Sequence, residues 1–202
     1  MITKQNKKGN VLAAVLITLG IIIAIALIIG SWVAGSYNSL TDKDTSVENQ
    51  WGKVQSAYER RLDLIPNLVA TVKGSASFEQ DTQTQIAAMR GGIRDAKTVS
   101  DMQKVDGQMS ALMSGINVQI EAYPALKSTE NFMALQDELA GTENRIKWER
   151  DEYNNQVKDY KYAVRSFPTN IIAGMFGFEQ SKWDMFQSND GAENAPQVDF
   201  TK

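Results

Sequence analysis

The sequence predicts an all-α protein, in which an N-terminal transmembrane helix is followed by a long antiparallel four-helix bundle. Two observations lead to this fold class. Residues 11–34 form an almost uninterrupted apolar run. After them, apolar residues recur at alternating spacings of three and four, which places them along one face of a helix. The sequence contains neither strand-like alternation nor an Asn-Gly hairpin signal.

The first apolar segment has the length of a membrane span. Residues 11–29 are apolar apart from Thr18 and Gly20. At about 1.5 Å per residue, a helix of this length matches a hydrocarbon core of roughly 30 Å. The short segment 1–10 before it is basic, and Trp32 follows at the depth of the membrane interface. We therefore expect the lipid bilayer as a partner, with the N-terminus in the cytoplasm and the main domain on the other side.

A cleaved secretory signal is the alternative interpretation of this segment. Such signals usually carry an apolar region of about 7–15 residues and an A-x-A-like cleavage site. The run here is longer, and Val33 and Gly35 match such a site poorly. We expect an uncleaved, single-pass anchor.

Residues 37–187 are expected to form the helical bundle, and residues 188–202 a disordered acidic tail. The first bundle helix carries an apolar stripe from Val47 to Val72. Pro66 lies within this stripe and lacks an N–H, so we expect it to kink one long helix. The start of a second helical segment at this proline is the alternative.

Further stripes predict the remaining helices. The second helix ends after Gly91 and Gly92. The fourth opens at residues 128–130 and carries apolar positions through Val164, which gives it more than 35 residues. The third helix is the clearest, and Pro124 stops it. Its stripe consists of Met102, Val105, Met109, Leu112, Ile116, Ile120 and Tyr123.

Charged residues intrude on the apolar stripes of the first and fourth helices. An arginine of one helix paired with Asp63, Glu143 or Glu149 of another is a device that specifies how the helices align. A functional site is the alternative, but we favour the structural role, because long arginine side chains commonly lie along helix faces. The candidates for this interhelical polar network are Arg60, Arg61, Asp63, Glu143 and Arg150.

A second apolar run lies near the C-terminus and has two possible roles. It is a cap over one end of the bundle, or a patch for membrane contact or self-assembly. The run contains no lysine or arginine, unlike a typical helix that binds anionic lipid. We name its candidate residues the C-terminal apolar patch: Phe167, Pro168, Ile171, Ile172, Met175, Phe176 and Phe178.

Composition removes most enzyme classes. The chain has no cysteine and no histidine, which excludes thiol nucleophiles, disulfides, ordinary zinc sites and histidine acid–base catalysis. No phosphate-binding loop, nucleophile elbow or EF-hand pattern occurs. Neighbouring acids such as Glu149 and Asp151 usually form a solvated helix face, so we expect no metal and no cofactor. The acidic balance after residue 35 argues against nucleic acid as a partner.

Five strings, in this order, closely resemble the LemA family of bacterial membrane proteins. The resemblance extends from about residue 37 to residue 186 and leaves out the tail. It implies an N-terminal transmembrane anchor, a long helical bundle and an association with bacterial membranes, and it brings no catalytic motif. The strings are ERRLDLIPNLVATVKG at 59–74, EAYPALKS at 121–128, LQDELAGTENRI at 135–146, ERDEYNNQVKDY at 149–160 and SFPTNIIAGMFGF at 166–178.

These observations favour a non-enzymatic scaffold in the bacterial inner membrane. We expect it to associate with copies of itself and to organise or remodel the envelope membrane. The alternative is an adaptor or sensor module that binds a membrane protease, a transporter or a signalling protein through one face of the bundle. A carboxylate-dependent hydrolase would require two acids that converge in a pocket, which spacing alone does not establish.

Overall fold

The structure is a computed structural model that describes residues 7–71, 76–121 and 129–187. Helices account for most of these ranges, and the described residues include no strand, which confirms the predicted all-α class. The elements are α1 (Lys7–Thr71), α2 (Ala76–Asp95), α3 (Val99–Glu121), α5 (Glu130–Arg165), α6 (Thr169–Phe176) and the short 3₁₀ helix η1 (Gln180–Lys182).

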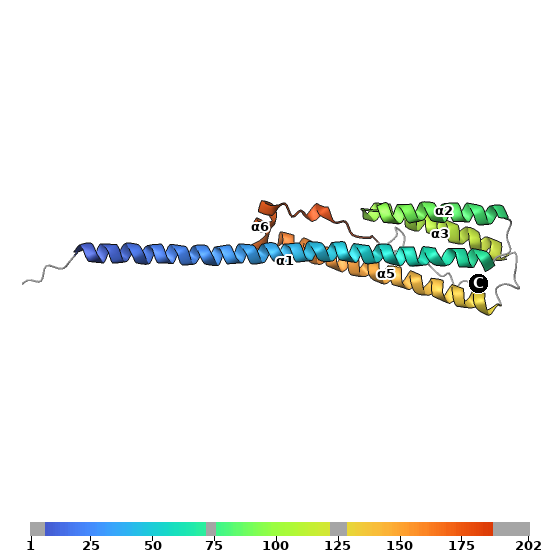
Figure 1. The fold of residues 1–202 in the computed structure, drawn as a ribbon, viewed down its shortest axis with the longest axis horizontal. Coiled ribbons are helices and arrows are strands. Elements are labelled where there is room, and N and C mark those ends of the chain that lie inside the picture. Colours follow the sequence, from blue (N-terminus) through green and yellow to red (C-terminus); the bar gives the residue numbers. More distant parts are fainter. Residues whose placement is uncertain (1–6, 72–75, 122–128, 188–202) are drawn as a thin grey trace, which may run out of the picture.

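The membrane segment and the first bundle helix are one continuous helix. The 65 residues of α1 run from the basic N-terminal segment through the apolar span into the bundle (Figure 1). Within the described ranges, α1 is the helix whose length and composition allow it to cross a bilayer. The helix continues through Pro66 to Thr71, so the proline does not start a second segment.

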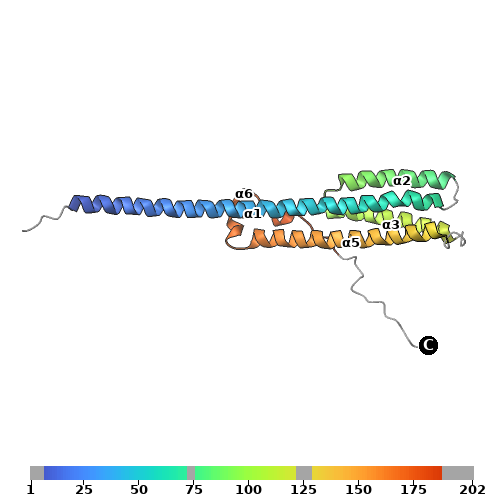
Figure 2. The ribbon, with the colours of Figure 1, turned by 60° about the horizontal axis from the view of Figure 1, so that its bottom comes forward.

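The bundle has two tiers along the axis of α1. Helices α1 and α5 run antiparallel and pack together over the full length of α5 (Figure 2). Helices α2 and α3 complete four-helix packing only in the tier farther from the apolar part of α1 (Figure 1). In the nearer tier, α6, η1 and the segment after them fold back onto the α1–α5 pair. The C-terminal segment therefore covers the part of the pair that α2 and α3 do not reach.

The predicted stripes form the core. The stripe of α3 is buried at each described position, whereas Tyr123 lies outside the described residues, as do the side chains of Val72 and Phe78. Thr142, a polar residue on the stripe of α5, is also buried, and its hydroxyl donates a hydrogen bond to the carbonyl of Leu139 at 2.7 Å. This local bond satisfies the hydroxyl without a partner on another helix.

Two side chains of α1 donate hydrogen bonds to the turn between α2 and α3. The indole N–H of Trp51 donates to the carbonyl of Ala96 at 3.1 Å, and the amide of Gln55 donates to the carbonyl of Ile93 at 2.8 Å. These donors satisfy carbonyls at the end of α2 that have no partner within their own helix. Thr98 and Asp101 then form a reciprocal cap at the start of α3.

Candidate functional site

The C-terminal apolar patch lies where α1 emerges from the predicted membrane span. The ring of Tyr37 contacts the rings of Phe176 and Phe178, with centroid distances of 4.9 and 5.7 Å. Tyr37 follows Ile29 by eight residues, or about 12 Å along the helix. Helix α6 therefore packs on α1 about two turns beyond the end of the predicted span.

The two roles considered for this patch fall on different faces of α6. Ile172 is buried against the α1–α5 pair, while Pro168 and Phe178 are half-buried. Four side chains of the patch keep about half or more of their surface exposed, although Phe176 also contacts Tyr37: Phe167 (81%), Ile171 (52%), Met175 (71%) and Phe176 (51%). One face of α6 thus caps the pair, and the other presents large apolar side chains to the surroundings.

A glycine ends α6 and turns the chain back along the bundle. Gly177 has φ 77°, in the left-handed region that favours glycine, and its N–H bonds to the carbonyl of Ala173. Further along, Lys182 pairs with Asp44 at 2.5 Å, and the indole N–H of Trp183 donates to the same carboxylate at 2.8 Å. These contacts fix the C-terminal segment on α1 and hold α6 in place.

The segment ends in an aromatic cluster. The ring of Phe186 stacks on Trp51 at 5.9 Å and meets Tyr153 edge-on at 5.5 Å. The side-chain amide of Asn154 bonds to both the N–H and the carbonyl of Phe186, at 2.8 and 2.9 Å. Sequence reasoning assigned no role to Asn154, because nothing in its spacing indicates which backbone it meets.

The predicted polar residues make interhelical pairs, though not as one network. Arg61 of α1 lies 3.4 Å from Glu143 of α5, whereas Arg60 reaches Glu138 at 3.9 Å. Asp63 pairs with Arg90 of α2 at 2.7 Å. Arg150 pairs with Asp106 of α3 at 3.5 Å. The partners Arg90, Asp106 and Glu138 were not among the predicted residues, because spacing within one helix does not reveal the facing helix.

Two of these pairs, Arg61 with Glu143 and Arg150 with Asp106, line a hollow of about 760 Å³ beside α5. The hydroxyl of Tyr58 and the Nε of Arg61 are buried nearby, without a hydrogen-bond partner among the described residues. Burial raises the pKa of Tyr58, and the nearby carboxylate of Asp106 raises it further. This cluster holds charged groups at partial burial, where their interactions are stronger than on an open surface.

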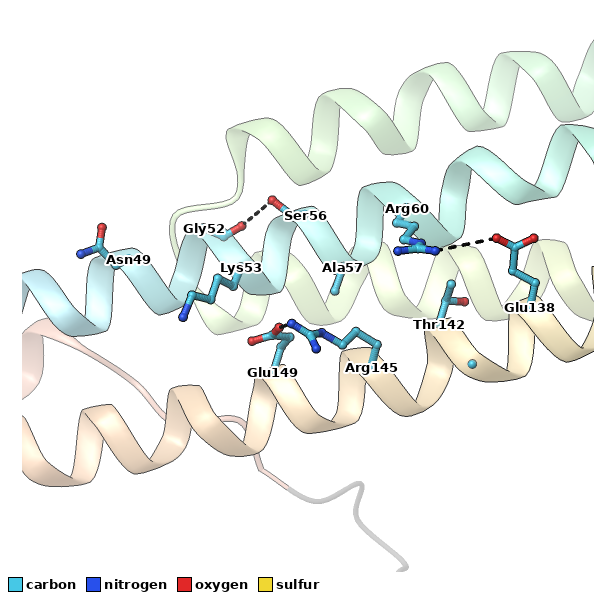
Figure 3. A pocket seen from close by; sticks show the side chains of 11 residues that line it. Asn49, Gly52, Lys53, Ser56, Ala57, Arg60, Glu138, Thr142, Arg145 and Glu149 are labelled. Atoms are coloured by element: carbon cyan, nitrogen blue, oxygen red, sulfur yellow. Dashed lines mark hydrogen bonds and ion pairs between the residues drawn. The ribbon is translucent and has the colours of Figure 1, made fainter.

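A larger groove, of about 900 Å³, opens between α1 and α5 on another face (Figure 3). It exists because small residues line both helices there, and a Cβ added at Gly52 or Gly141 would meet no atom within 4 Å. Basic side chains border it at Lys53, Arg60 and Arg145.

Glu149 lies at the edge of this groove, and its buried carboxylate corrects one sequence-based expectation. It accepts a hydrogen bond from the amide of Gln50 at 2.6 Å and forms an ion pair with Arg145 of its own helix at 2.5 Å. The other two acids expected to meet an arginine of another helix, Asp63 and Glu143, do so. Placing Glu149 on a solvated acidic face is wrong, because its position on the stripe of α5 turns it toward α1. Among the described residues, no three acidic side chains converge in a way that could hold a metal ion.

Comparison with known proteins decides the family. The model of the LemA family matches residues 50–200. The chain belongs to the LemA family. This match begins later than the resemblance from residue 37 and extends beyond residue 186 into the tail, so the expectation that the tail lies outside the resemblance is wrong.

Curated relatives agree with this assignment. Protein LemA of Metamycoplasma hominis is 23% identical over 141 residues, which cover 69% of this chain and 64% of the relative. Magnetosome protein MamQ of Magnetospirillum gryphiswaldense is 24% identical over 173 residues, covering 73% and 64%. Magnetosome protein MamQ 2 of Paramagnetospirillum magneticum is 24% identical over 110 residues, covering 54% and 39%. The chain thus spans less than two thirds of the length of these relatives.

Proposed function

We propose that this LemA-family protein is a non-enzymatic scaffold that associates with copies of itself and organises or remodels the bacterial inner membrane. The observation that carries the proposal is that a second apolar surface, on α6, packs beside the end of the apolar span of α1. Helix α1 continues without a break from the span into the bundle, and the exposed face of α6 lies beside its exit from the membrane.

The continuity of α1 makes the membrane and the bundle mechanically one unit. A helix of 65 residues is about 100 Å long. Its apolar span and its bundle half share one axis, so a tilt of the bundle tilts the span. A scaffold that shapes a membrane requires such coupling, whereas a flexible linker would remove it.

The exposed face of α6 provides the second membrane contact. Full burial of one large apolar side chain contributes about 1.5–3 kcal/mol. The exposed parts of Ile171, Met175 and Phe176, together with Phe167 just before the helix, therefore favour shallow insertion into the interface. Insertion of this kind enters one leaflet only, and its strength depends on curvature. We further propose that this leaflet faces away from the cytoplasm, because the basic segment 1–10 favours an N-terminus on the cytoplasmic side.

Reconstitution of the full chain tests this proposal. The protein would be purified in mild detergent, sized by light scattering, inserted into lipid vesicles and imaged by electron microscopy. We expect particles of several copies and vesicles of altered shape. The double substitution Ile171→Asn and Met175→Asn changes only exposed side chains of α6, so it should keep the fold and reduce the change in vesicle shape. A strictly monomeric particle together with unaltered vesicles would refute the scaffold.

One observation favours the adaptor alternative. Trp148 is exposed, and the guanidinium of Arg145, which borders the groove between α1 and α5, lies 4.8 Å from its ring centroid. Tryptophan and arginine are enriched where protein partners bind most strongly. A photoreactive residue at position 148 should therefore crosslink in cells either to a second copy, as the scaffold requires, or to a foreign membrane protein, as the adaptor requires.

A further inference from the structure

Three basic side chains follow one face of the last turns of α5. Lys158, Lys161 and Arg165 are separated by three and four residues, a spacing that brings helix side chains onto the same face. They line a groove of about 470 Å³ together with Tyr162, Ser166 and Met185. Tyr162 is among the most exposed aromatic side chains of the described residues, at 73%. The groove combines positive charge with an exposed aromatic ring.

The alignment of α5 with α1 puts this groove close to the membrane. Side-chain contacts bring Glu149 level with Gln50, and Glu143 level with Arg61. Arg165 lies 16 residues beyond Glu149 and 22 beyond Glu143 on an antiparallel helix. Both helices rise by the same distance per residue, so Arg165 lies beside roughly residues 34–39 of α1.

Those residues follow Ile29 by five to ten positions, or about 8–15 Å. The headgroup region extends roughly 5–8 Å beyond the hydrocarbon. The long stem of an arginine at this height lets its charge reach the headgroups. Lys161 and Lys158 follow at increasing height, and α6 lies at the same end of the bundle (Figures 1 and 2).

The three basic side chains of this groove have no ion-pair partner among the described residues. Within the described residues, no carboxylate forms an ion pair with Lys158, Lys161 or Arg165, whereas Lys182 nearby is paired with Asp44. Basic residues at a helix C-terminus stabilise the helix dipole, but that effect fades within the last turn. It accounts for Arg165 and leaves Lys158, two turns earlier, without a structural role.

We propose that this groove binds the phosphate of an anionic phospholipid in the leaflet from which α1 emerges. The proposal rests on the proposed function, because it requires α6 to lie in the same interface. The apolar run at 167–178 contains no basic residue, and the fold supplies the missing charges from α5. Apolar side chains of α6 and cations of α5 lie at the same end of the bundle, and together they match the two parts of a lipid, an acyl chain and a headgroup. An acidic protein segment would use the charges but not the apolar face beside them.

Native mass spectrometry of the full chain in detergent tests this site. Delipidated protein would be titrated with phosphatidylglycerol, phosphatidylcholine or inorganic phosphate. We expect phosphatidylglycerol to bind more tightly than phosphatidylcholine, and phosphate not to compete at millimolar concentration. A basic residue near an anionic surface contributes roughly fivefold in affinity, and this contribution falls with distance from the surface. Arg165 is the nearest of the three, so the triple substitution Lys158→Gln, Lys161→Gln and Arg165→Gln should weaken phosphatidylglycerol binding at least about fivefold.

A matched control changes the same number of charges elsewhere. Arg94, Lys97 and Lys147 are exposed, and no described residue forms an ion pair with them, so their substitution by glutamine should leave lipid binding unchanged. Equal binding of the two lipids, equal loss in both triple variants, or displacement of the lipid by phosphate would each overturn the site.

A second readout separates this site from the proposed function. The chain has no cysteine, so Met175→Cys offers one position for an environment-sensitive dye on α6. Insertion of the dye in phosphatidylcholine vesicles, combined with no preference for phosphatidylglycerol, would remove the headgroup site and leave the scaffold intact. A dye that stays in water would count against the scaffold, whatever the lipid preference.

Discussion

At the scale of single residues, Glu149 shows how the bundle accommodates a charge in its core. The carboxylate is almost completely buried, yet it accepts a hydrogen bond from Gln50 and forms an ion pair with Arg145. A buried charge is tolerated only when such partners compensate for lost hydration. The same contact aligns α5 with α1.

Glu149→Ala should therefore lower the free energy of unfolding. The substitution removes the carboxylate acceptor of the Gln50 amide and leaves it only the main-chain carbonyl of residue 149, at 3.2 Å. Loss of a hydrogen bond to a charged group costs about 1.5–3 kcal/mol. Urea unfolding of the full chain in detergent, followed by helical circular dichroism, measures the change. Asp159→Ala removes an exposed acid from the same helix and should change stability by less than about 0.5 kcal/mol. Equal effects of the two substitutions would show that the buried contact contributes nothing.

Tyr160 makes stability depend on pH in the alkaline range. Its burial, followed by the charge of Asp44, raises the pKa of its hydroxyl to about 12, from an ordinary value of about 10. The folded protein thus favours the neutral phenol, so this contribution is complete below about pH 10 and is lost as pH rises toward 12. Tyr160→Phe should make the fall in the urea midpoint between pH 9 and 11 shallower. An unchanged slope would contradict this assignment.

At the scale of the elements, two adjacent glycines on α2 are expected to respond differently to substitution. A Cβ at Gly92 would lie 3.0 Å from Cγ2 of Val105 on α3, whereas one at Gly91 would meet nothing within 4 Å. Gly91→Ala should stabilise the protein by about 0.5–1 kcal/mol through helix propensity. Gly92→Ala should gain less or destabilise, because valine has few alternative rotamers. Thermal unfolding of both variants compares them directly, and equal shifts would contradict the close approach of α2 and α3.

Sequence periodicity was sufficient for the helices themselves. Apolar spacing predicted the buried stripe of α3, and the run of apolar residues predicted the continuous span of α1. Contacts between side chains of different helices could not be predicted in the same way. Asp106 meets Arg150, and Trp51 caps α2, through contacts that depend on which helices face each other. Periodicity defines a face of one helix, while its partner is determined by packing of the whole chain.

The C-terminal apolar patch shows the same limit at the site. Composition predicted that residues 167–178 would form either a cap over the bundle or a patch for membrane contact or self-assembly. Because α6 is a helix, one face can form the cap while the other stays open: Ile172 is buried, whereas Ile171 and Met175 are exposed. The basic groove on α5 escaped sequence reasoning, since Lys158 and Arg165 look like ordinary surface residues until the alignment with α1 gives their height above the membrane.

At the scale of the whole molecule, one helix connects the apolar span, the bundle and α6. Helix α1 supplies the apolar span, one side of the two-tier bundle and the surface on which α6 rests. A change at the far end of the bundle is thereby connected to the membrane through a continuous hydrogen-bonded helix. In the proposed scaffold, the side of the membrane on which the bundle lies would determine which leaflet α6 contacts.

The orientation can be read from single cysteines, because the chain has none of its own. Met133 is exposed near the start of α5, far from the span, and Gln5 lies in the basic segment before it. With the bundle outside the cytoplasm, an impermeant maleimide should label Met133→Cys in intact spheroplasts, and Gln5→Cys only after permeabilisation. The reverse pattern would put the bundle in the cytoplasm and α6 against the inner leaflet. Loss of the Gln5→Cys label from a shortened mature protein, even after permeabilisation, would show that the apolar segment is removed and would refute the anchor.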